Sequence, residues 1–266
     1  MRLIACDLDG TLLDPSAQLS ARSAAALRAA AAAGVHVVLA SGRPPFMLQP
    51  VLPHVGDSVT YGVLANGSVV CTLPDGTPMR EVHFELAQAT GVIRQLRAAD
   101  DGYGFAFATD AGFAHEDGFA QRMPAPQTIP RSDDALDAAV GATRAVKLMV
   151  FHRDHRVHTL LDLVPGIVGP ELQVSHLGAD CVEVGPAGVD KATGLAWLCD
   201  HLGVDAADVV VFGDEYNDHG MLQWAGHGVA MANADSVTKA LADEVTLSNA
   251  DDGVAVVIER LLAERR

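Results

Sequence analysis

Short, uninterrupted apolar runs alternate with helix-like segments at both ends of the 266-residue chain, and this alternation limits the possible folds strongly. In the first third, apolar runs at 2–6, 35–40 and 61–65 accompany a helical pattern between Ser20 and Gly34. After Gly188 the rhythm returns, with helices at 191–202, 218–224 and from Val254, and strands at 209–212 and 228–231. Strands that are apolar throughout belong to parallel sheets covered on both faces. We therefore predict an α/β fold with a doubly wound parallel sheet.

The middle of the chain has a different pattern. Its apolar runs are shorter and more alternating, and predict helices at 85–99 and 153–163 and strands at 104–109, 145–151, 172–176 and 181–184. We expect a core of 1–82 and 187–266 with an α+β domain, 83–186, inserted into it. His152, His155 and His158 recur at three-residue spacing, but no cysteine or carboxylate completes a metal-ligand set, and we interpret them as a polar helix start.

Composition limits the partners and the cellular compartment that we expect for this chain. A formal net charge of −16 argues against a nucleic-acid or anionic-membrane partner. No apolar stretch reaches the roughly 18 residues of a membrane span, and Asp7 falls where a signal peptide needs its apolar stretch. We expect a cytoplasmic protein. Its four cysteines are widely spaced and without a CxxC pair, which favours reduced, buried thiols.

The first apolar run ends in Asp7-Leu8-Asp9-Gly10-Thr11. Two carboxylates two positions apart in an extended segment point to the same side, and the glycine permits a tight turn. The pair could bind a divalent cation, or one carboxylate could act as a nucleophile while the other transfers protons. It could also be no more than a strand end that runs into an Asp-Gly turn.

Other polar groups follow strand ends in the same way. Ser41-Gly42-Arg43 follows one apolar run, and Gly213-Asp214 follows another, with Asn217-Asp218 at the next helix start. Lys191 opens the helix after the inserted domain. Ligands of open parallel sheets bind outside the carboxyl ends of the strands. Taken singly, Lys191 could be a solvated cation, Ser41 a helix cap, and Asp214 and Asp218 turn and N-cap residues.

In this order, these motifs resemble the haloacid dehalogenase superfamily of aspartate-nucleophile phosphatases. Finer matches resemble its Cof-like subfamily IIB, which carries a C2-type cap: Asp-Leu-Asp-Gly-Thr-Leu-Leu, Ala-Ser-Gly-Arg-Pro, Asn66-Gly67, Asn217-Asp218 followed by Met221-Leu222, and Gly-Val-Ala-Met-Ala-Asn-Ala at 228–234. Only 33 residues separate Asp7 from Ser41, whereas 149 separate Ser41 from Lys191. Any cap must therefore lie in the second gap, as it does in this subfamily.

The resemblance implies a role for each residue. Asp7 would attack phosphorus and form an aspartyl-phosphate, while Asp9 would serve as general acid and base and bind the metal through its backbone carbonyl. Asp7 and Asp214 would hold Mg²⁺, with Asp218 a direct or supporting ligand. Phosphoryl oxygens would bind Ser41, Lys191 and Asn217.

Further residues are assigned to phosphate or substrate binding with less defined roles, namely Gly10, Thr11, Gly42, Arg43 and Asn66. Arg43 could reach a second anionic group of the substrate or form a local salt bridge. Asn66-Gly67 could lie at the rim of the site or form a simple tight turn.

The function expected from this resemblance is Mg²⁺-dependent hydrolysis of a small phosphate monoester, such as a sugar phosphate or a related metabolite. A metal-dependent glycosyltransferase would leave Ser41, Lys191 and the second acidic cluster without a role. A phosphomutase of the same superfamily would share every catalytic residue. A non-catalytic sugar-phosphate-binding regulator is disfavoured because both the nucleophile and the proton-transfer position are present.

Overall fold

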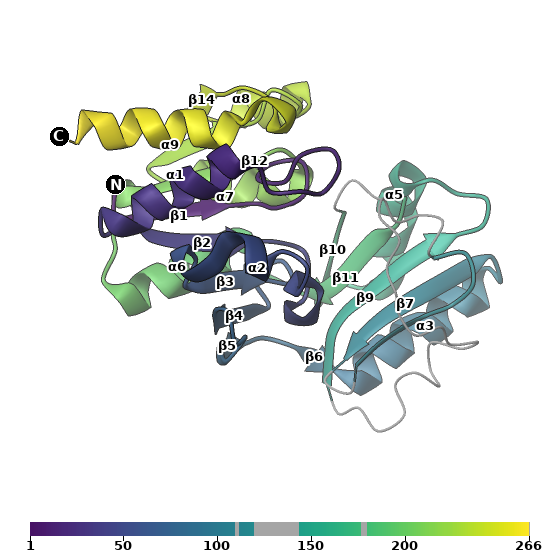
Figure 1. The fold of residues 1–266 in the computed structure, drawn as a ribbon. Coiled ribbons are helices and arrows are strands. Elements are labelled where there is room, and N and C mark those ends of the chain that lie inside the picture. Colours follow the sequence, from purple (N-terminus) through teal and green to yellow (C-terminus); the bar gives the residue numbers. More distant parts are fainter. Residues whose placement is uncertain (110–111, 120–143, 177–179, 266) are drawn as a thin grey trace. The chain divides into compact units, whose positions relative to one another are not determined.

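The computed structural model describes residues 1–109, 112–119, 144–176 and 180–265, which form two compact units (Figure 1). Unit 1 contains Met1–Glu81 and Asp190–Arg266, and unit 2 contains Val82–Val189. The sequence analysis expected the inserted domain at 83–186.

Unit 1 is built on a mixed sheet of eight strands in its described part, in the order β14-β13-β12-β1-β2-β3-β4-β5. The strands are β1 Leu3–Cys6, β2 His36–Ala40, β3 Tyr61–Leu64, β4 Val69–Thr72, β5 Pro78–Glu81, β12 Val209–Gly213, β13 His227–Ala230 and β14 Glu244–Val245. β14 to β3 run parallel, and β4 and β5 add an antiparallel edge. The predicted α/β class is confirmed, but the sequence analysis did not anticipate the β4–β5 hairpin.

Helices cover both faces of this sheet (Figure 1). They are α1 Ala21–Ala32, α2 Leu52–Val55, α6 Lys191–Leu202, α7 His219–Trp224, α8 Ser236–Leu241 and α9 Gly253–Glu264. Short 3₁₀ segments lie at Pro45–Leu48, Gly56–Ser58, Ala206–Asp208, Tyr216–Asp218 and Asn249–Asp251. Leu195 and Leu198 of α6 and Met221 of α7 pack on alternate sheet residues such as Leu3 and Val211. α1 packs against α9. Burial on both faces explains why the central strands are apolar throughout.

The parallel strands all end at one edge of the sheet. β1 pairs with β12 on one side and β2 on the other, with Cys6 opposite both Phe212 and Leu39. The residues that follow these strands therefore emerge beside one another, although they lie far apart in the sequence. Helix α6 begins at the same edge with Lys191, as the sequence predicted.

Unit 2 has its own sheet and core. Its strands are β6 Phe84–Glu85, β7 Tyr103–Thr109, β8 Gly112–His115, β9 Arg144–His152, β10 Leu172–Ser175 and β11 Val182–Pro186, with helices α3 Leu86–Ala99 and α5 Val157–Val168. In the part of unit 2 that the structure describes, five strands pair in the order β10-β11-β9-β7-β8, and β6 pairs with β9. Side chains from α3, α5 and the sheet, including Ile93, Phe105 and Leu160, form one core. Lys147 and Glu183 form a buried ion pair between β9 and β11.

The expected helix at 153–163 was wrong at both ends. β9 continues to His152, whose buried ring accepts backbone N–H bonds from Asp154 and His155 through Nδ1 and so turns the chain before α5. His152 therefore ends a strand and does not begin a helix. α5 also continues past Pro165 to Val168, because its last turn places Ile167 and Val168 against the unit 2 core.

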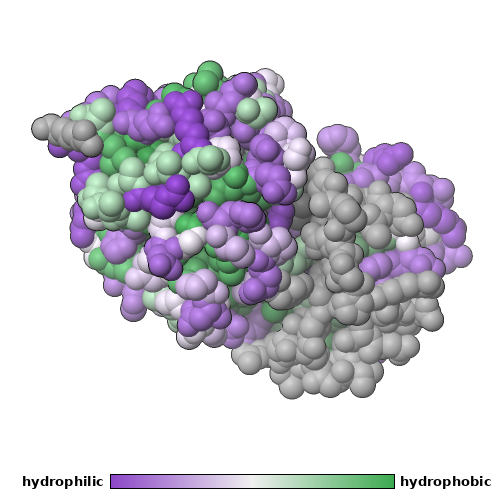
Figure 2. All heavy atoms as spheres, viewed as in Figure 1, coloured by the Kyte–Doolittle hydropathy of each residue, from purple (hydrophilic) through white to green (hydrophobic). Residues whose placement is uncertain are grey.

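All four cysteines are free and buried, as expected. Among the described residues, no helix has the length and apolar character needed to cross a membrane. On the visible face of unit 1, hydrophilic residues are interspersed with scattered apolar ones (Figure 2), in keeping with the net charge of −16.

Asp190 caps the helix that delivers Lys191, and its removal should weaken unit 1. The Asp190 carboxylate accepts the Thr193 N–H at 2.7 Å, and Thr193 Oγ1 accepts the Asp190 N–H at 2.9 Å. Asp190→Ala should lower stability by about 1 kcal/mol, which is a decrease in melting temperature of roughly 2–4 °C. Asp190→Ser retains a cap acceptor and should lose less. Equal melting temperatures for Asp190→Ala and the wild type would contradict this account.

Candidate active site

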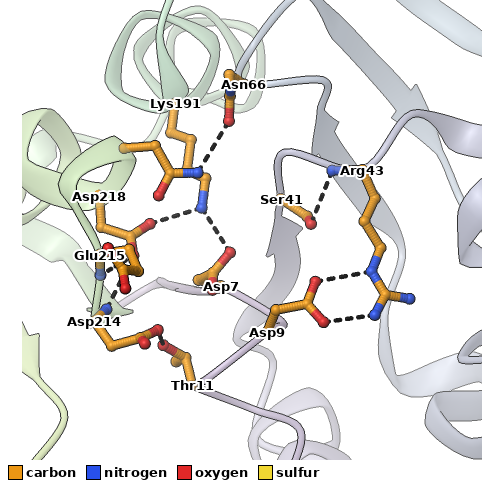
Figure 3. A network of polar contacts seen from close by, with 11 residues as sticks. Asp7, Asp9, Thr11, Ser41, Arg43, Asn66, Lys191, Asp214, Glu215 and Asp218 are labelled. Atoms are coloured by element: carbon orange, nitrogen blue, oxygen red, sulfur yellow. Dashed lines mark hydrogen bonds and ion pairs between the residues drawn. The ribbon is translucent and has the colours of Figure 1, made fainter. Parts of the chain in front are cut away.

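Polar side chains from four segments of unit 1 meet at the carboxyl edge of its sheet (Figure 3). Asp7 follows β1, and its N–H extends the hydrogen bonding between β1 and β12 by donating to Phe212 O at 3.0 Å. Ser41 follows β2, Asp214 follows β12, and Lys191 begins α6. Asp7, Ser41, Lys191 and Asp214 are all at most 8% exposed. Lys191 is therefore not a solvated surface cation, which was one alternative left open by the sequence.

Lys191 is the centre of this group. Its Nζ donates to Asp7 Oδ1 at 2.6 Å and to Asp218 Oδ1 at 2.7 Å, and the side chain is fully buried. A buried ammonium is costly unless charges of opposite sign surround it. The two carboxylates supply that compensation, and the lysine in turn fixes the position of Asp7.

Asp218 uses its second oxygen to shape the loop after β12. Oδ2 accepts the backbone N–H of Asp214 at 2.9 Å and that of Glu215 at 3.1 Å. A Cβ at Gly213 would lie 2.5 Å from the Asp218 Cβ, so a glycine is needed where the loop folds over this side chain. Asp218 thus accepts three N–H bonds and leaves about one of its four lone-pair sites.

Asp214 is held from the β1 loop. Thr11 Oγ1 donates to Asp214 Oδ1 at 2.6 Å. Gly10 has a φ of 82°, and a Cβ there would lie 2.2 Å from Asp214 Oδ2. Asn233, which follows β13, donates through Nδ2 to Gly10 O at 2.8 Å. In this structure Gly10 and Thr11 therefore position Asp214.

The electrostatics of the cluster are dominated by carboxylates. Burial raises the pKa of Asp7 well above the usual carboxyl range; the Lys191 charge opposes this, and Asp218 and Asp214 add to it. Burial also raises the pKa of Asp214 to about 7, although the hydrogen bond from Thr11 acts to lower it. For Lys191, burial alone would lower the pKa, but the charges of Asp218 and Asp7 outweigh it and raise the pKa above its ordinary value.

These groups fit a divalent metal ion. Asp7, Asp214 and Asp218 each offer one carboxylate oxygen, and the three oxygens lie within 4.8 Å of one another. One ammonium faces three carboxylates, and the repulsion between these carboxylates adds to the effect of burial on the pKa values of Asp7 and Asp214, so a further cation would relieve it. Hard oxygen ligands of this kind suit Mg²⁺.

Asp9 lies outside this cluster and forms an ion pair with Arg43. The guanidinium donates from Nε to Asp9 Oδ2 at 2.8 Å and from a terminal nitrogen to Oδ1 at 2.5 Å (Figure 3). The Asp9 side chain is 46% exposed, in contrast to Asp7. Of the two alternatives for Arg43, the structure has the local salt bridge. Ser41 Oγ accepts the Arg43 N–H at 3.1 Å and so shapes the loop between them.

Asn66 and Asn217 meet across the site. Asn217 Nδ2 donates to Asn66 Oδ1 at 3.1 Å. Asn66 lies in a turn after β3, and its N–H donates to Ser41 O at 3.1 Å. The buried Gly42 lies in the Ser41–Arg43 loop. The structure thus brings the predicted residues of all four motifs to one edge of unit 1.

Sequence reasoning gave no role to Asn233. Its signal was available, because it follows the apolar strand at 228–231 in the same way that Ser41 and Asp214 follow theirs. Applied to every strand, the strand-end rule would have placed Asn233 at the site.

The chain is similar to known proteins over most of its length. The chain matches the haloacid dehalogenase-like hydrolase family over residues 4–258. It is 29% identical over 273 residues to the pyridoxal phosphate phosphatase YbhA of Escherichia coli strain K12, covering 97% of each chain. It is 28% identical over 244 residues to an HMP-PP phosphatase of Yersinia pestis strain Pestoides F, covering 88% of this chain and 84% of that protein.

Solved structures are similar to this chain as well. A haloacid dehalogenase-like hydrolase from B. subtilis has a TM-score of 0.82 and 25% identity, covering 98% of this chain and 100% of that one. Another from Bacteroides thetaiotaomicron has a TM-score of 0.79 and 26% identity, covering 98% and 99%.

The raised pKa of Asp214 predicts that Mg²⁺ stabilises the protein more at about pH 8 than at about pH 6. Without metal, a carboxyl with a raised folded-state pKa contributes stability at low pH that is lost as the pH rises from about 4 through about 7. Below pH 7, Mg²⁺ must also displace a proton from Asp214, which weakens apparent binding by up to about tenfold per pH unit. The measurement is the rise in melting temperature on adding Mg²⁺ to chelator-treated protein at each pH.

Asp214→Asn is the comparison variant: it removes one titrating group and one proposed metal ligand, so both the Mg²⁺ response and its dependence on pH should be smaller than in the wild type. A Mg²⁺-induced rise that is equal at the two pH values, or larger at the lower one, would contradict the assignment.

Proposed function

Because the chain belongs to the haloacid dehalogenase-like hydrolase family, we propose that it hydrolyses small phosphate monoesters with Mg²⁺ through a phosphorylated Asp7. The observation that carries the proposal is the buried Asp7 carboxylate, fixed by Lys191 beside Asp214 and Asp218. An aspartate held in this way is a positioned nucleophile next to the charges needed to accept a phosphoryl group.

In the first step, a carboxylate oxygen of Asp7 attacks phosphorus and the bond from phosphorus to the leaving alkoxide breaks. The alkoxide takes a proton from Asp9. The Asp9–Arg43 ion pair forms with the ionised carboxylate, so Asp9 must leave Arg43 and carry a proton when it acts as the acid. Its 46% exposure gives it access to water for that exchange.

In the second step, a water molecule attacks the phosphorus of the aspartyl-phosphate and releases the Asp7 carboxylate and inorganic phosphate. Asp9, now ionised, takes the proton of that water. The same ionised form pairs with Arg43 in the structure. One residue thus serves as acid and then as base, and the cycle returns to its starting state.

Asp7 and Asp214 are the side chains proposed to hold Mg²⁺, which when bound would neutralise charge on the phosphoryl group. Asp218 already accepts three N–H bonds, so we assign it to positioning Lys191 and the loop that carries Asp214. The backbone carbonyl of Asp9 remains a predicted ligand. Ser41, Asn217 and Lys191 are proposed to bind the phosphoryl oxygens, where charge is spread in the transition state.

The substrate class follows from the site and from the relatives. The unit 1 residues described here recognise a phosphoryl group, which every candidate substrate shares. The relatives named above are phosphatases of pyridoxal phosphate and HMP-PP, and a Bacillus subtilis relative with 26% identity is named a 5-amino-6-(5-phospho-D-ribitylamino)uracil phosphatase. We therefore propose a small phosphorylated metabolite as the substrate.

A panel of phosphorylated sugars, nucleotides and cofactors, assayed for phosphate release with Mg²⁺, tests this proposal. We expect release from at least one compound, and its loss in Asp7→Asn, which lacks the charged nucleophile. Asp190→Ser serves as the control because it lies outside the cluster and retains the helix cap. Phosphate release by Asp7→Asn at the wild-type rate would overturn the mechanism, and conversion of a substrate to an isomer without release would indicate a mutase.

The role of Asp9 as general acid predicts that its importance depends on the leaving group. Asp9→Asn should lower kcat/KM for an alkyl phosphate by about a hundredfold or more. The loss should be much smaller for p-nitrophenyl phosphate, since p-nitrophenolate departs without a proton and kcat/KM reports only the first step. Equal losses for both substrates would remove Asp9 from the acid role.

A further inference from the structure

The turn after β3 has an unusual backbone. Ala65, Asn66 and Gly67 have φ values of 49°, 54° and 91°, so three successive residues lie in the left-handed region. Only glycine adopts this region without penalty, and asparagine tolerates it better than alanine does. Such backbone persists where the surrounding structure holds it, and it concentrates at functional sites.

Two neighbouring segments of the site hold this turn. The Ala65 N–H donates to Arg43 O at 3.0 Å, and the Asn66 N–H donates to Ser41 O at 3.1 Å. On the other side, a Cβ at Gly67 would lie 2.0 Å from the Asp190 carbonyl oxygen. The turn therefore packs directly against the residue that precedes Lys191.

The Asn66 side chain reaches a third segment. Its Oδ1 accepts the Asn217 Nδ2–H at 3.1 Å, the contact that Figure 3 draws from Asn66. An amide nitrogen carries two hydrogens in the plane of the group. When Asn66 takes one, the plane of the Asn217 amide is fixed and so is the direction of the other hydrogen.

We propose that Asn66 is a positioning residue that orients Asn217 for the phosphoryl group, within a turn that ties together the segments carrying Ser41, Lys191 and Asn217. The proposal rests on the proposed function, because it takes Asn217 as a ligand of the phosphoryl oxygens. Asn66 itself acts through Asn217 and does not contact the substrate. An amide donor that is already oriented needs no rearrangement when charge develops on the phosphoryl oxygens.

A double-mutant cycle between Asn66→Gly and Asn217→Ala tests this role. Glycine tolerates the left-handed backbone at residue 66 and removes the side chain that carries the Oδ1 acceptor. We expect Asn217→Ala to lower kcat/KM about 10–100-fold, and Asn66→Gly to lower it about tenfold, chiefly through kcat. The double variant should be no worse than Asn217→Ala alone, since residues that act as one unit are not additive.

Two outcomes would overturn the proposal. Losses that multiply in the double variant would mean that Asn66 acts independently of Asn217, and wild-type kcat in Asn66→Gly would mean that the contact serves structure alone. Ala17→Gly is the matched control, because Ala17 is also left-handed, with a φ of 57°, and is exposed outside the site. Its kinetics should equal those of the wild type.

The same cycle, measured on the Kd of orthovanadate with Mg²⁺, separates this proposal from the proposed function. Orthovanadate imitates the transferring phosphoryl group and is read without turnover. Wild-type binding by Asn217→Ala would contradict the assignment of Asn217 to the phosphoryl group. Weaker binding by Asn217→Ala, with a further multiplicative loss from Asn66→Gly, would overturn only the positioning role of Asn66.

Discussion

The buried ammonium of Lys191 is the interaction on which the rest of the site depends. It lies against Asp7 and Asp218, with Asp214 nearby, and it is the sole lysine among these carboxylates in the described part of the chain. Burial raises the pKa values of Asp7 and Asp214, and the negative charge that the lysine leaves uncompensated adds to this effect. A divalent cation would remove that surplus charge. This charge balance supports the proposal that the site binds a metal ion and an anionic substrate together.

The fold supplies this arrangement through strand order. β1 lies between β12 and β2, so the loops that carry Asp7, Asp214 and Ser41 are neighbours despite their separation in sequence. Lys191 is brought to the same edge because α6 begins there, immediately after unit 2 ends at Val189. Closely packed glycines complete the approach: Gly10 and Gly213 admit the carboxylates of Asp214 and Asp218 where a side chain would collide with them.

Much of this could be predicted from sequence, since buried parallel strands are apolar throughout and their ends are marked by polar residues. The sequence correctly predicted that α6 begins at Lys191. It also showed the family resemblance, which the match over residues 4–258 confirms. The burial of Lys191 could not be predicted, because nothing local distinguishes it from a surface lysine. The hydrogen bonds from Thr11 to Asp214 and from Asn217 to Asn66 join segments that lie far apart in the sequence, and local sequence patterns do not predict such contacts. The interpretation of His152 was wrong for a related reason. The three-residue spacing of His152, His155 and His158 does not distinguish a buried ring at the end of a strand from a polar residue at the start of a helix.

The central claim is that Asp7 becomes phosphorylated during turnover. The most direct measurement is to add borohydride to the wild-type enzyme during turnover of its substrate with Mg²⁺, and then to analyse the peptide that contains residue 7 by mass spectrometry. An acyl phosphate is reduced to an alcohol, so this account predicts homoserine at position 7 and unchanged aspartate at position 9. Unmodified aspartate at position 7 under active turnover, or reduction at another carboxylate, would contradict it.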